Sequence, residues 1–347
     1  MNASRLSPFF SSFCIRSTRL PHIACACIVL AALTALTGCA SLQVKMGMKV
    51  YLAKTPIATM EILQDRGPGI APGQKSSLVV FFTQPGGLAL QTEGVGGGKV
   101  MWRDLQITST VVSVTPKGVI SLPRDPRQSD RQMPHVIVTV PSHPDLRAEV
   151  DIPLRYDIAN GTNFSGSDGA KGFDGSNGQD GLSGSTGSMD PDHPSAGGNG
   201  SNGGNGGDGQ NGWPGGDAPP VQIDIAFRPG DHPLLEVGVF APGHKRFYLI
   251  DPQGGSLSVR ADGGSGGKGG SGGRAGRGGS GGIGSPNGSS GLDGHAGSDG
   301  RDGSDGSGGL ITVTCDPRAM PYLGMLQLSS RNGPRPVYQQ APVAPLW

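Results

Sequence analysis

Hydrophobic and polar positions alternate along several short stretches between residues 42 and 158, which is the pattern of strands with one buried face. The clearest alternation covers residues 44–52. Further stretches rich in Val, Ile, Leu, Phe and Thr lie between Pro- and Gly-containing turns, at residues 77–83, 105–114, 135–140 and 148–156. Several short strands at this spacing predict a β-sandwich domain, which we place at residues 39–160.

A second β-rich block is predicted at residues 217–262. Its alternating or apolar stretches cover residues 221–227, 235–241, 246–250 and 256–260. The pattern resumes near the C-terminus, so residues 310–347 are expected to begin with a final strand and to end in an extended, Pro-rich tail. Cys315 falls on the apolar face of that strand, which predicts a buried and inert thiol.

Glycine recurs at every third residue in four runs, at residues 166–187, 197–215, 264–284 and 288–309. The runs pair by length, and a short break separates the members of each pair, at residues 188–196 and 285–287. Equal arms joined by short Pro-containing breaks predict hairpins. We place the two glycine-rich hairpins at residues 161–216 and 263–309, so that the second β block carries both.

Three arrangements compete for these runs. A collagen triple helix requires glycine at every third residue but also abundant proline, and Pro214 is the sole proline within the runs. A disordered linker suits the composition but needs no fixed period. A bundle of polyproline-II-like glycine helices explains the period, because a helix with three residues per turn then presents a bare face to a neighbouring backbone.

The number of bare faces predicts where each arm lies. The run at 264–284, and part of the run at 197–215, reads Gly-Gly-x and should be central; the other two read Gly-x-x and should be outer. This repeat resembles the polyglycine II bundles of phage tail adhesins and of a glycine-rich antifreeze protein. The resemblance covers the repeat alone, over about 100 residues. Together with the strand patterns, it predicts a mostly β fold that carries a four-arm polyglycine II-like bundle, and we expect a monomer.

The N-terminus carries export signals. Three arginines precede an apolar stretch that is too short to span a bilayer comfortably. It ends in Leu36-Thr37-Gly38-Cys39, and these four residues resemble the lipobox of bacterial lipoproteins. The resemblance implies a signal peptide at residues 1–38, a lipid on the Cys39 thiol that anchors the chain to a membrane, and an outer-membrane lipoprotein in the cell envelope of a Gram-negative bacterium. An ordinary signal peptide with a chance cysteine is the alternative.

Without residues 1–38 the chain has a net charge of about −2, so we expect no nucleic-acid partner. Asp190, Asp192 and His193 lie together in the first break and are candidate tip or ligand contacts, although the Asp and Pro residues there favour a solvated turn. Trp213 interrupts a polar run and is a candidate sugar platform or bundle anchor. Aspartates of the 288–309 run favour weak ion pairs across the bundle, or solubility.

Motifs for catalysis are missing from the sequence. It has no G-x-S-x-G elbow, no Cys–His pair, no zinc-ligand spacing and no P-loop, so we expect no enzyme, no cofactor and no metal. The sequence predicts a cell-envelope protein with a structural or adhesive role. The alternative is a periplasmic or surface module that binds polysaccharide or a partner protein.

Overall fold

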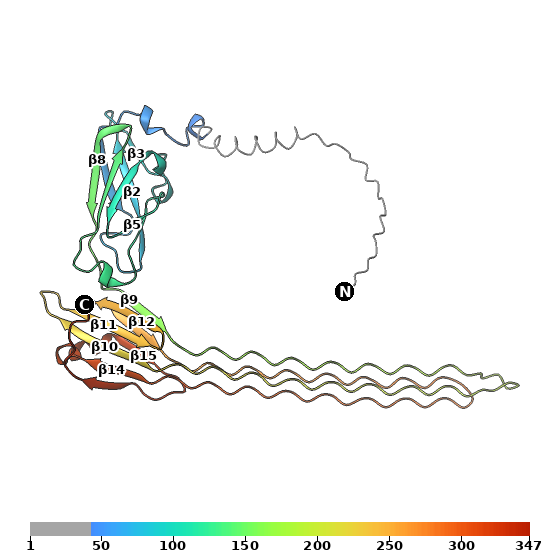
Figure 1. Cartoon of the computed structure of the whole chain (residues 1–347). Coiled ribbons are helices and arrows are strands. Elements are labelled where there is room, and N and C mark those ends of the chain that lie inside the picture. Colours follow the sequence, from blue (N-terminus) through green and yellow to red (C-terminus); the bar gives the residue numbers. More distant parts are fainter. Residues whose placement is uncertain (1–42) are drawn as a thin grey trace, which may run out of the picture.

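The computed structural model describes residues 43–347, which form two β units and four long extended segments that leave the second unit side by side (Figure 1). The fold is mostly β, with 31% of residues in strands and 8% in helices, and the described part of the chain forms several sheets and no barrel. Residues 43–45 are α-helical, and the other short helices are of the 3-10 type. They are η1 (Leu52–Lys54), η2 (Gly94–Gly96), η3 (Trp102–Asp104), η4 (Pro126–Gln128) and η5 (Pro317–Met325).

The first unit contains two sheets. One has the order β1-β2-β6-β5, with β3 also paired to β2, and the other has the order β4-β7-β8. Their bounds are β1 (Thr59–Gln64), β2 (Lys75–Thr83), β3 (Ala89–Gln91), β4 (Gln106–Thr110), β5 (Ser113–Val114), β6 (Val119–Ser121), β7 (His135–Val140) and β8 (His143–Asp151). Alternating residues such as Val136 and Val138 are fully buried, so they form a core shared with Phe82 and Ile120.

Three predicted strands of this unit differ in the structure. The one predicted at residues 148–156 is β8, which begins at His143 and ends at Asp151. Residues 44–52 do not form a strand, because residues 44 and 45 are helical, Gly47 turns the chain with a φ of 70°, and Val50 makes only an isolated bridge. Met46 and Met48 are consequently exposed. The stretch at 105–114 divides into β4 and β5, because Val111 has a φ of 66°, which turns the chain between them. Apolar alternation alone does not reveal either turn.

The second unit is also built from two sheets, in the orders β12-β11-β10-β14-β16 and β15-β13-β9. Its strands are β9 (Ala159–Asn163), β10 (Val221–Arg228), β11 (Leu234–Ala241), β12 (His244–Ile250), β13 (Ser256–Arg260), β14 (Ile311–Cys315), β15 (Leu326–Ser329) and β16 (Val337–Gln340). β9 pairs with β13, so the boundary placed at residue 160 falls inside a strand of this unit. Apolar residues from both sheets form one core.

The C-terminal region contains more regular structure than the sequence analysis predicts. η5 and β15 follow β14, and β16 pairs with β14 as a parallel edge strand inside the part expected to be a plain extended tail. Cys315 is buried and free, as predicted, and burial raises the pKa of its thiol to about 11. The thiol is therefore not ionised at neutral pH.

The four extended segments are segment 1 (166–187), segment 2 (197–216), segment 3 (263–284) and segment 4 (288–309). Segment 1 follows β9 and segment 3 follows β13, and these two strands are parallel neighbours. Segments 2 and 4 lead into β10 and β14, which are also parallel neighbours. Each hairpin of segments therefore leaves one sheet of the second unit and returns to the other (Figure 1).

Backbone hydrogen bonds join these segments at every third residue. Segments 1 and 2 run antiparallel, and the amide of Gly207 donates to the carbonyl of Ser176 at 2.8 Å. Segment 3 donates to segment 2, as from Gly270 to Gln210 at 2.8 Å, and segment 4 donates to segment 3. Segment 1 also donates to segment 3, and segment 2 to segment 4. Among the described residues, segments 2 and 3 thus bond to three neighbours each, and segments 1 and 4 to two.

The glycines are required where one backbone faces another. A Cβ atom on Gly270 would collide with the carbonyl group of Phe173, and one on Gly291 would collide with that of Ser201. Because both obstacles are backbone atoms, no side-chain rotation relieves the clash. The same collision recurs along all four segments, which explains the three-residue period of glycine.

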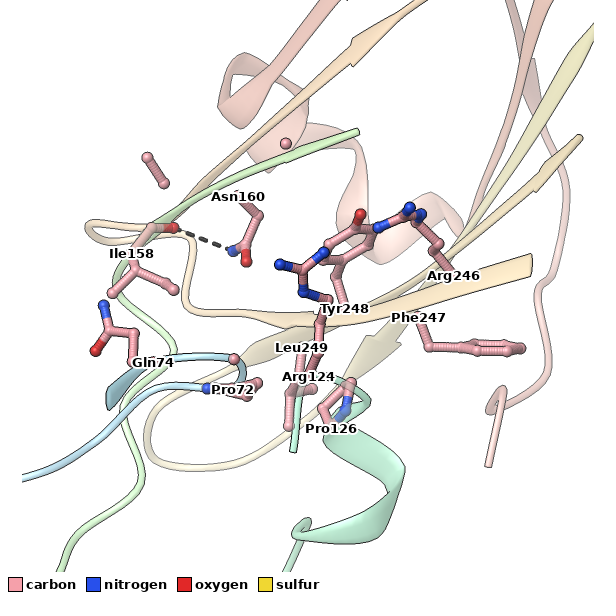
Figure 2. A pocket seen from close by; sticks show the side chains of 13 residues that line it. Pro72, Gln74, Arg124, Pro126, Ile158, Asn160, Arg246, Phe247, Tyr248 and Leu249 are labelled. Carbon is pink, nitrogen blue, oxygen red and sulfur yellow. Dashed lines mark hydrogen bonds between the residues drawn. The ribbon is translucent and has the colours of Figure 1, made fainter. Parts of the chain in front are cut away.

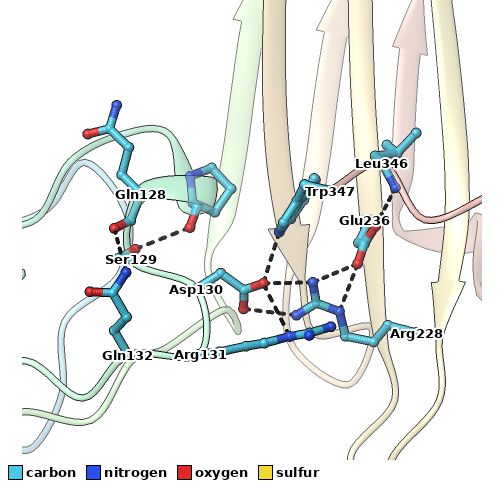
Figure 3. Close-up of polar contacts among 10 residues, drawn as sticks. Gln128, Ser129, Asp130, Arg131, Gln132, Arg228, Glu236, Leu346 and Trp347 are labelled. Atoms are coloured by element: carbon cyan, nitrogen blue, oxygen red, sulfur yellow. Dashed lines mark hydrogen bonds and ion pairs between the residues drawn. The ribbon is translucent and has the colours of Figure 1, made fainter.

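The two β units meet at a cleft and at a polar cluster. The cleft lies between β9, β12 and two loops of the first unit (Figure 2). In the polar cluster, Arg228 of β10 binds Asp130 of the first unit at 2.7 Å and Glu236 of β11 at 2.6 Å. The indole of Trp347 donates to Asp130, and the amide of Leu346 donates to Glu236 (Figure 3). The C-terminus therefore contributes to the contact between the units.

Burial alone would raise the pKa of Asp130, but the hydrogen bonds and positive charge of Arg228, together with the Trp347 hydrogen bond, lower it. The carboxylate is therefore charged at neutral pH, which favours its pairing with Arg228. Arg127 adds a stacking contact, with its guanidinium 3.7 Å from the centre of the Phe247 ring.

A valine at a bare glycine tests this packing directly. We expect Gly270→Val to destabilise the segments by about 3 kcal/mol or more, because the branched side chain meets backbone of segment 1. Ser271→Val is the matched control, since Ser271 is the next residue and is exposed. Thermal unfolding and amide exchange of both variants measure the difference. Equal effects of the two substitutions would contradict the packing.

Candidate functional site

The segments meet along five lines, one of which joins segments 2 and 3 through backbone hydrogen bonds. We call the other four lines seams and name each by the two segments that form it. On the first–third seam, side-chain oxygens of segment 1 accept backbone N–H groups of segment 3; Asp174 accepts from Ser271 at 2.8 Å. On the second–fourth seam, side-chain oxygens of segment 2 likewise accept backbone N–H groups of segment 4; Asn205 accepts from His295 at 2.8 Å. Asp168, Asn177 and Asp180 continue the first series, and Asn199, Asn202, Asp208, Asn211 and Asp217 continue the second.

The third–fourth seam uses aspartates of segment 4. Asp299 accepts the amide of Gly272 at 2.7 Å, and Asp293 accepts that of Gly278 at 2.7 Å. Asp302 and Asp305 do the same farther along the seam. Asp302 also binds Lys268 at 2.6 Å, but both side chains are exposed, so this ion pair adds little stability. The predicted ion pairing is therefore secondary, because these carboxylates mainly accept backbone N–H groups.

This role of Asp and Asn was missed in the sequence analysis. The signal is present in the sequence, because these residues recur at every third position beside the glycines. A short side chain with an oxygen two bonds from Cβ is suited to reach a neighbouring backbone N–H. What the sequence does not show is the offset between segments, which decides which amide each side chain meets.

The first–second seam is the one seam without charged side chains in the described segments. From segment 1 it carries Ser167, Ala170, Phe173, Ser176, Gln179, Leu182 and Ser185. From segment 2 it carries Gly198, Ser201, Gly204, Gly207, Gln210, Trp213 and Gly216. Phe173, Leu182 and Trp213 are 73%, 78% and 64% exposed. Hydroxyl and amide groups therefore alternate with exposed apolar side chains along one side of the segments.

Trp213 belongs to this seam through its backbone. Its N–H donates to Ala170 at 2.9 Å, and its carbonyl accepts from Gly267 at 2.8 Å, so the residue is held by segments 1 and 3. The indole itself is largely exposed and does not lie in a core. Phe173 lies one turn farther along segment 1, where its carbonyl accepts from Gln210. The two aromatic side chains thus lie on the same seam.

The three candidate residues of the first break lie at the end of the first hairpin. Asp190, Asp192 and His193 are all exposed. The Asp190 carboxylate accepts the amide of Asp192 at 3.0 Å, and its carbonyl accepts that of His193 at 3.2 Å. These contacts form a local turn. Across residues 43–347, no three His, Cys, Asp or Glu side chains converge in a way that could hold a metal ion.

The lipidation candidate Cys39 lies outside the residues that the structure describes. In the part that it does describe, no helix combines the length and apolar character that a membrane crossing requires. Comparison with known proteins gave no match to a family model, a curated protein or a solved structure.

Acid tests the contribution of the seam carboxylates. Hydrogen bonds from Lys171 and the Ser271 amide lower the pKa of Asp174, those from Ser298 lower that of Asp208, and those from Lys268 and the Gly269 amide lower that of Asp302. A pKa that is lower in the folded state stabilises the fold above the unfolded pKa, and this contribution is lost as the pH falls through the folded pKa.

We therefore expect the segments to lose stability as the pH falls below about 4. A triple variant, Asp174→Asn, Asp208→Asn and Asp302→Asn, keeps an oxygen acceptor at each site but does not titrate there. Its melting temperature should fall less between pH 4 and pH 2 than that of the wild type. An equal fall in melting temperature for the two proteins would show that these carboxylates do not contribute to stability.

Proposed function

We propose that the chain is a lipid-anchored cell-envelope protein with a structural or adhesive role, in which segments 1 to 4 form a polyglycine II-like bundle. The observation that carries the proposal is the repeated hydrogen bonding between segments. Segment 3 illustrates it, because its amides at Gly270, Ser271 and Gly272 donate to segments 2, 1 and 4 in turn. A flexible linker does not require such a fixed alignment between its segments.

The bundle is a rod in this proposal. Helices of the polyproline II type rise about 3.1 Å per residue, so 22 residues extend roughly 68 Å. Hydrogen bonds from each segment to two or three neighbours resist bending, which favours a spacer or a stalk. The donors and acceptors of the rod lie within one chain, and we accordingly propose a monomer rather than a collagen-like trimer.

The first–second seam is the proposed adhesive surface. Its exposed apolar side chains and its hydroxyl and amide groups suit a ligand that has apolar faces and many hydroxyl groups but no charge. A neutral polysaccharide at a cell surface has this chemistry. The other three seams all carry charged side chains, such as Asp180, Arg301 and Asp293, so they suit such a ligand less well.

The anchor in this proposal is Cys39, supported by the lipobox-like residues Leu36, Thr37 and Gly38 that precede it. Cys39→Ser should abolish lipidation, because the side chain that carries the lipid is lost, and should leave an uncleaved precursor. Mass spectrometry and membrane fractionation measure this result, and Cys315→Ser is the control that leaves the N-terminus unchanged. Normal processing and membrane retention of the Cys39 variant would refute the anchor.

The adhesive surface has its own test. We expect the full-length protein to bind neutral oligosaccharides on an array, and Phe173→Ala with Trp213→Ala to weaken that binding about fivefold or more. Leu292→Ala is the control, because Leu292 is 74% exposed but lies on the second–fourth seam. An unchanged affinity in the double variant, or an equal loss in the control, would argue for a purely structural role.

A further inference from the structure

A cleft of about 260 Å³ lies where the two β units meet, at the open edge of the second unit. β12 is the end strand of one sheet and β9 the end strand of the other, and both line the cleft. The first unit closes it with two loops, around Gln74 and around Arg124 (Figure 2). The cleft is smaller than the usual pocket for a drug-sized molecule, so it suits a small ligand.

Two arginines from different units line this cleft. Arg124 comes from the first unit and Arg246 from β12, and Figure 2 shows both side chains directed toward Tyr248. Among the described residues, neither guanidinium has a hydrogen-bonded or ionic partner, and none of the residues that line the cleft is acidic. Two positive groups that share a cleft without an anion repel each other.

Other arginines nearby are paired with carboxylates. Arg127 binds Asp125 at 2.7 Å, Arg155 binds Asp157 at 2.9 Å, and Arg228 binds Asp130 at 2.7 Å. Asp125 is the acidic residue nearest along the chain to Arg124, but its hydrogen bonds with Arg127 lower its pKa and occupy both of its oxygens. The positive charge of the cleft is therefore not neutralised by its surroundings.

Tyr248 provides a second observation that points to a ligand. Its side chain is 92% buried, and its hydroxyl group has no hydrogen-bond partner in the structure. A buried hydroxyl without a partner costs free energy, and an oxygen atom that entered between the two guanidinium groups would supply an acceptor. Asn160 donates its side-chain amide to Ile158, which leaves its side-chain oxygen as an acceptor for a ligand hydroxyl group.

We propose that this cleft binds an oxyanion, the carboxylate or phosphate of a small ligand such as an acidic sugar. Arg124 and Arg246 hold the anion from opposite units, the Tyr248 hydroxyl donates to it, and Asn160 accepts from a neighbouring hydroxyl group. Guanidinium groups suit this task because they present paired N–H donors that match the oxygens of carboxylate and phosphate. The inference depends on neither the rod nor the anchor, and an oxyanion bound here would join the two β units.

Isothermal titration of the full-length protein with sodium glucuronate and, separately, with inorganic phosphate tests the proposal. One or both should bind with one site per chain, and which binds distinguishes a uronate sugar from a phosphate group. Glucose, which has no anionic group, should not bind at this site. Arg124→Gln and Arg246→Gln should each weaken binding about tenfold or more. Arg66→Gln is the matched control, because Arg66 is an exposed and unpaired arginine of the first unit, and it should leave affinity unchanged.

Tyr248→Phe separates a ligand contact from a structural role. Removing an unpaired buried hydroxyl should leave the free protein as stable as before, or more stable, while it weakens anion binding several-fold. The proposal is overturned if neither anion binds saturably, if Arg66→Gln weakens binding as much as the cleft variants do, or if Tyr248→Phe leaves the affinity for the anion unchanged.

Discussion

The hydrogen bond from a backbone amide of one glycine-rich segment to an acceptor on its neighbour is the interaction on which the rest of the structure depends. The segments contain no apolar core, and their exposed Phe173, Leu182 and Trp213 point to solvent rather than inward. Glycine also loses more conformational freedom on ordering than any other residue. Each bond contributes only modestly, so order in this part of the chain requires that nearly every turn of every segment be bonded in the correct register.

The second β unit supplies that register. In β10 and β14, Val221 pairs with Ile311, an offset of 90 residues, and the amide of His295 meets Asn205 at the same offset. In β9 and β13 the paired residues are offset by 97, as are Asp174 and Ser271. A parallel strand pair thus continues into a parallel segment pair without a shift. The second β unit positions the first turn of each segment, and the three-residue period continues the same alignment along the segments.

The sequence predicts much of this chain because its periods are simple. Apolar and polar positions that alternate with a period of two identify most strands. The number of glycines per triplet distinguishes segment 3, which has three bonded neighbours, from segments 1 and 4, which have two. The sequence does not reveal contacts that depend on how the segments are aligned in space, such as the hydrogen bond from the amide of Gly272 to Asp299. The same holds for Arg124 and Arg246, which lie 122 positions apart in the sequence and line one cleft only when both units fold.

The second unit also holds the first unit. It does so through the edge strands β9 and β12 and through the C-terminal residues. Leu346 and Trp347 reach the carboxylates that bind Arg228, so the end of the chain takes part in the junction (Figure 3). One β unit therefore organises both the segments and the cleft.

The most direct measurement is the detection by nuclear magnetic resonance of scalar couplings across the backbone hydrogen bonds of the segments. The proposed bundle predicts a coupling between the amide nitrogen of Gly270 and the carbonyl carbon of Gln210, and another between Gly300 and Gly270. These couplings should persist on dilution, because both partners lie in one chain. Rapidly exchanging amides with no such couplings across segments 1 to 4 would contradict the bundle.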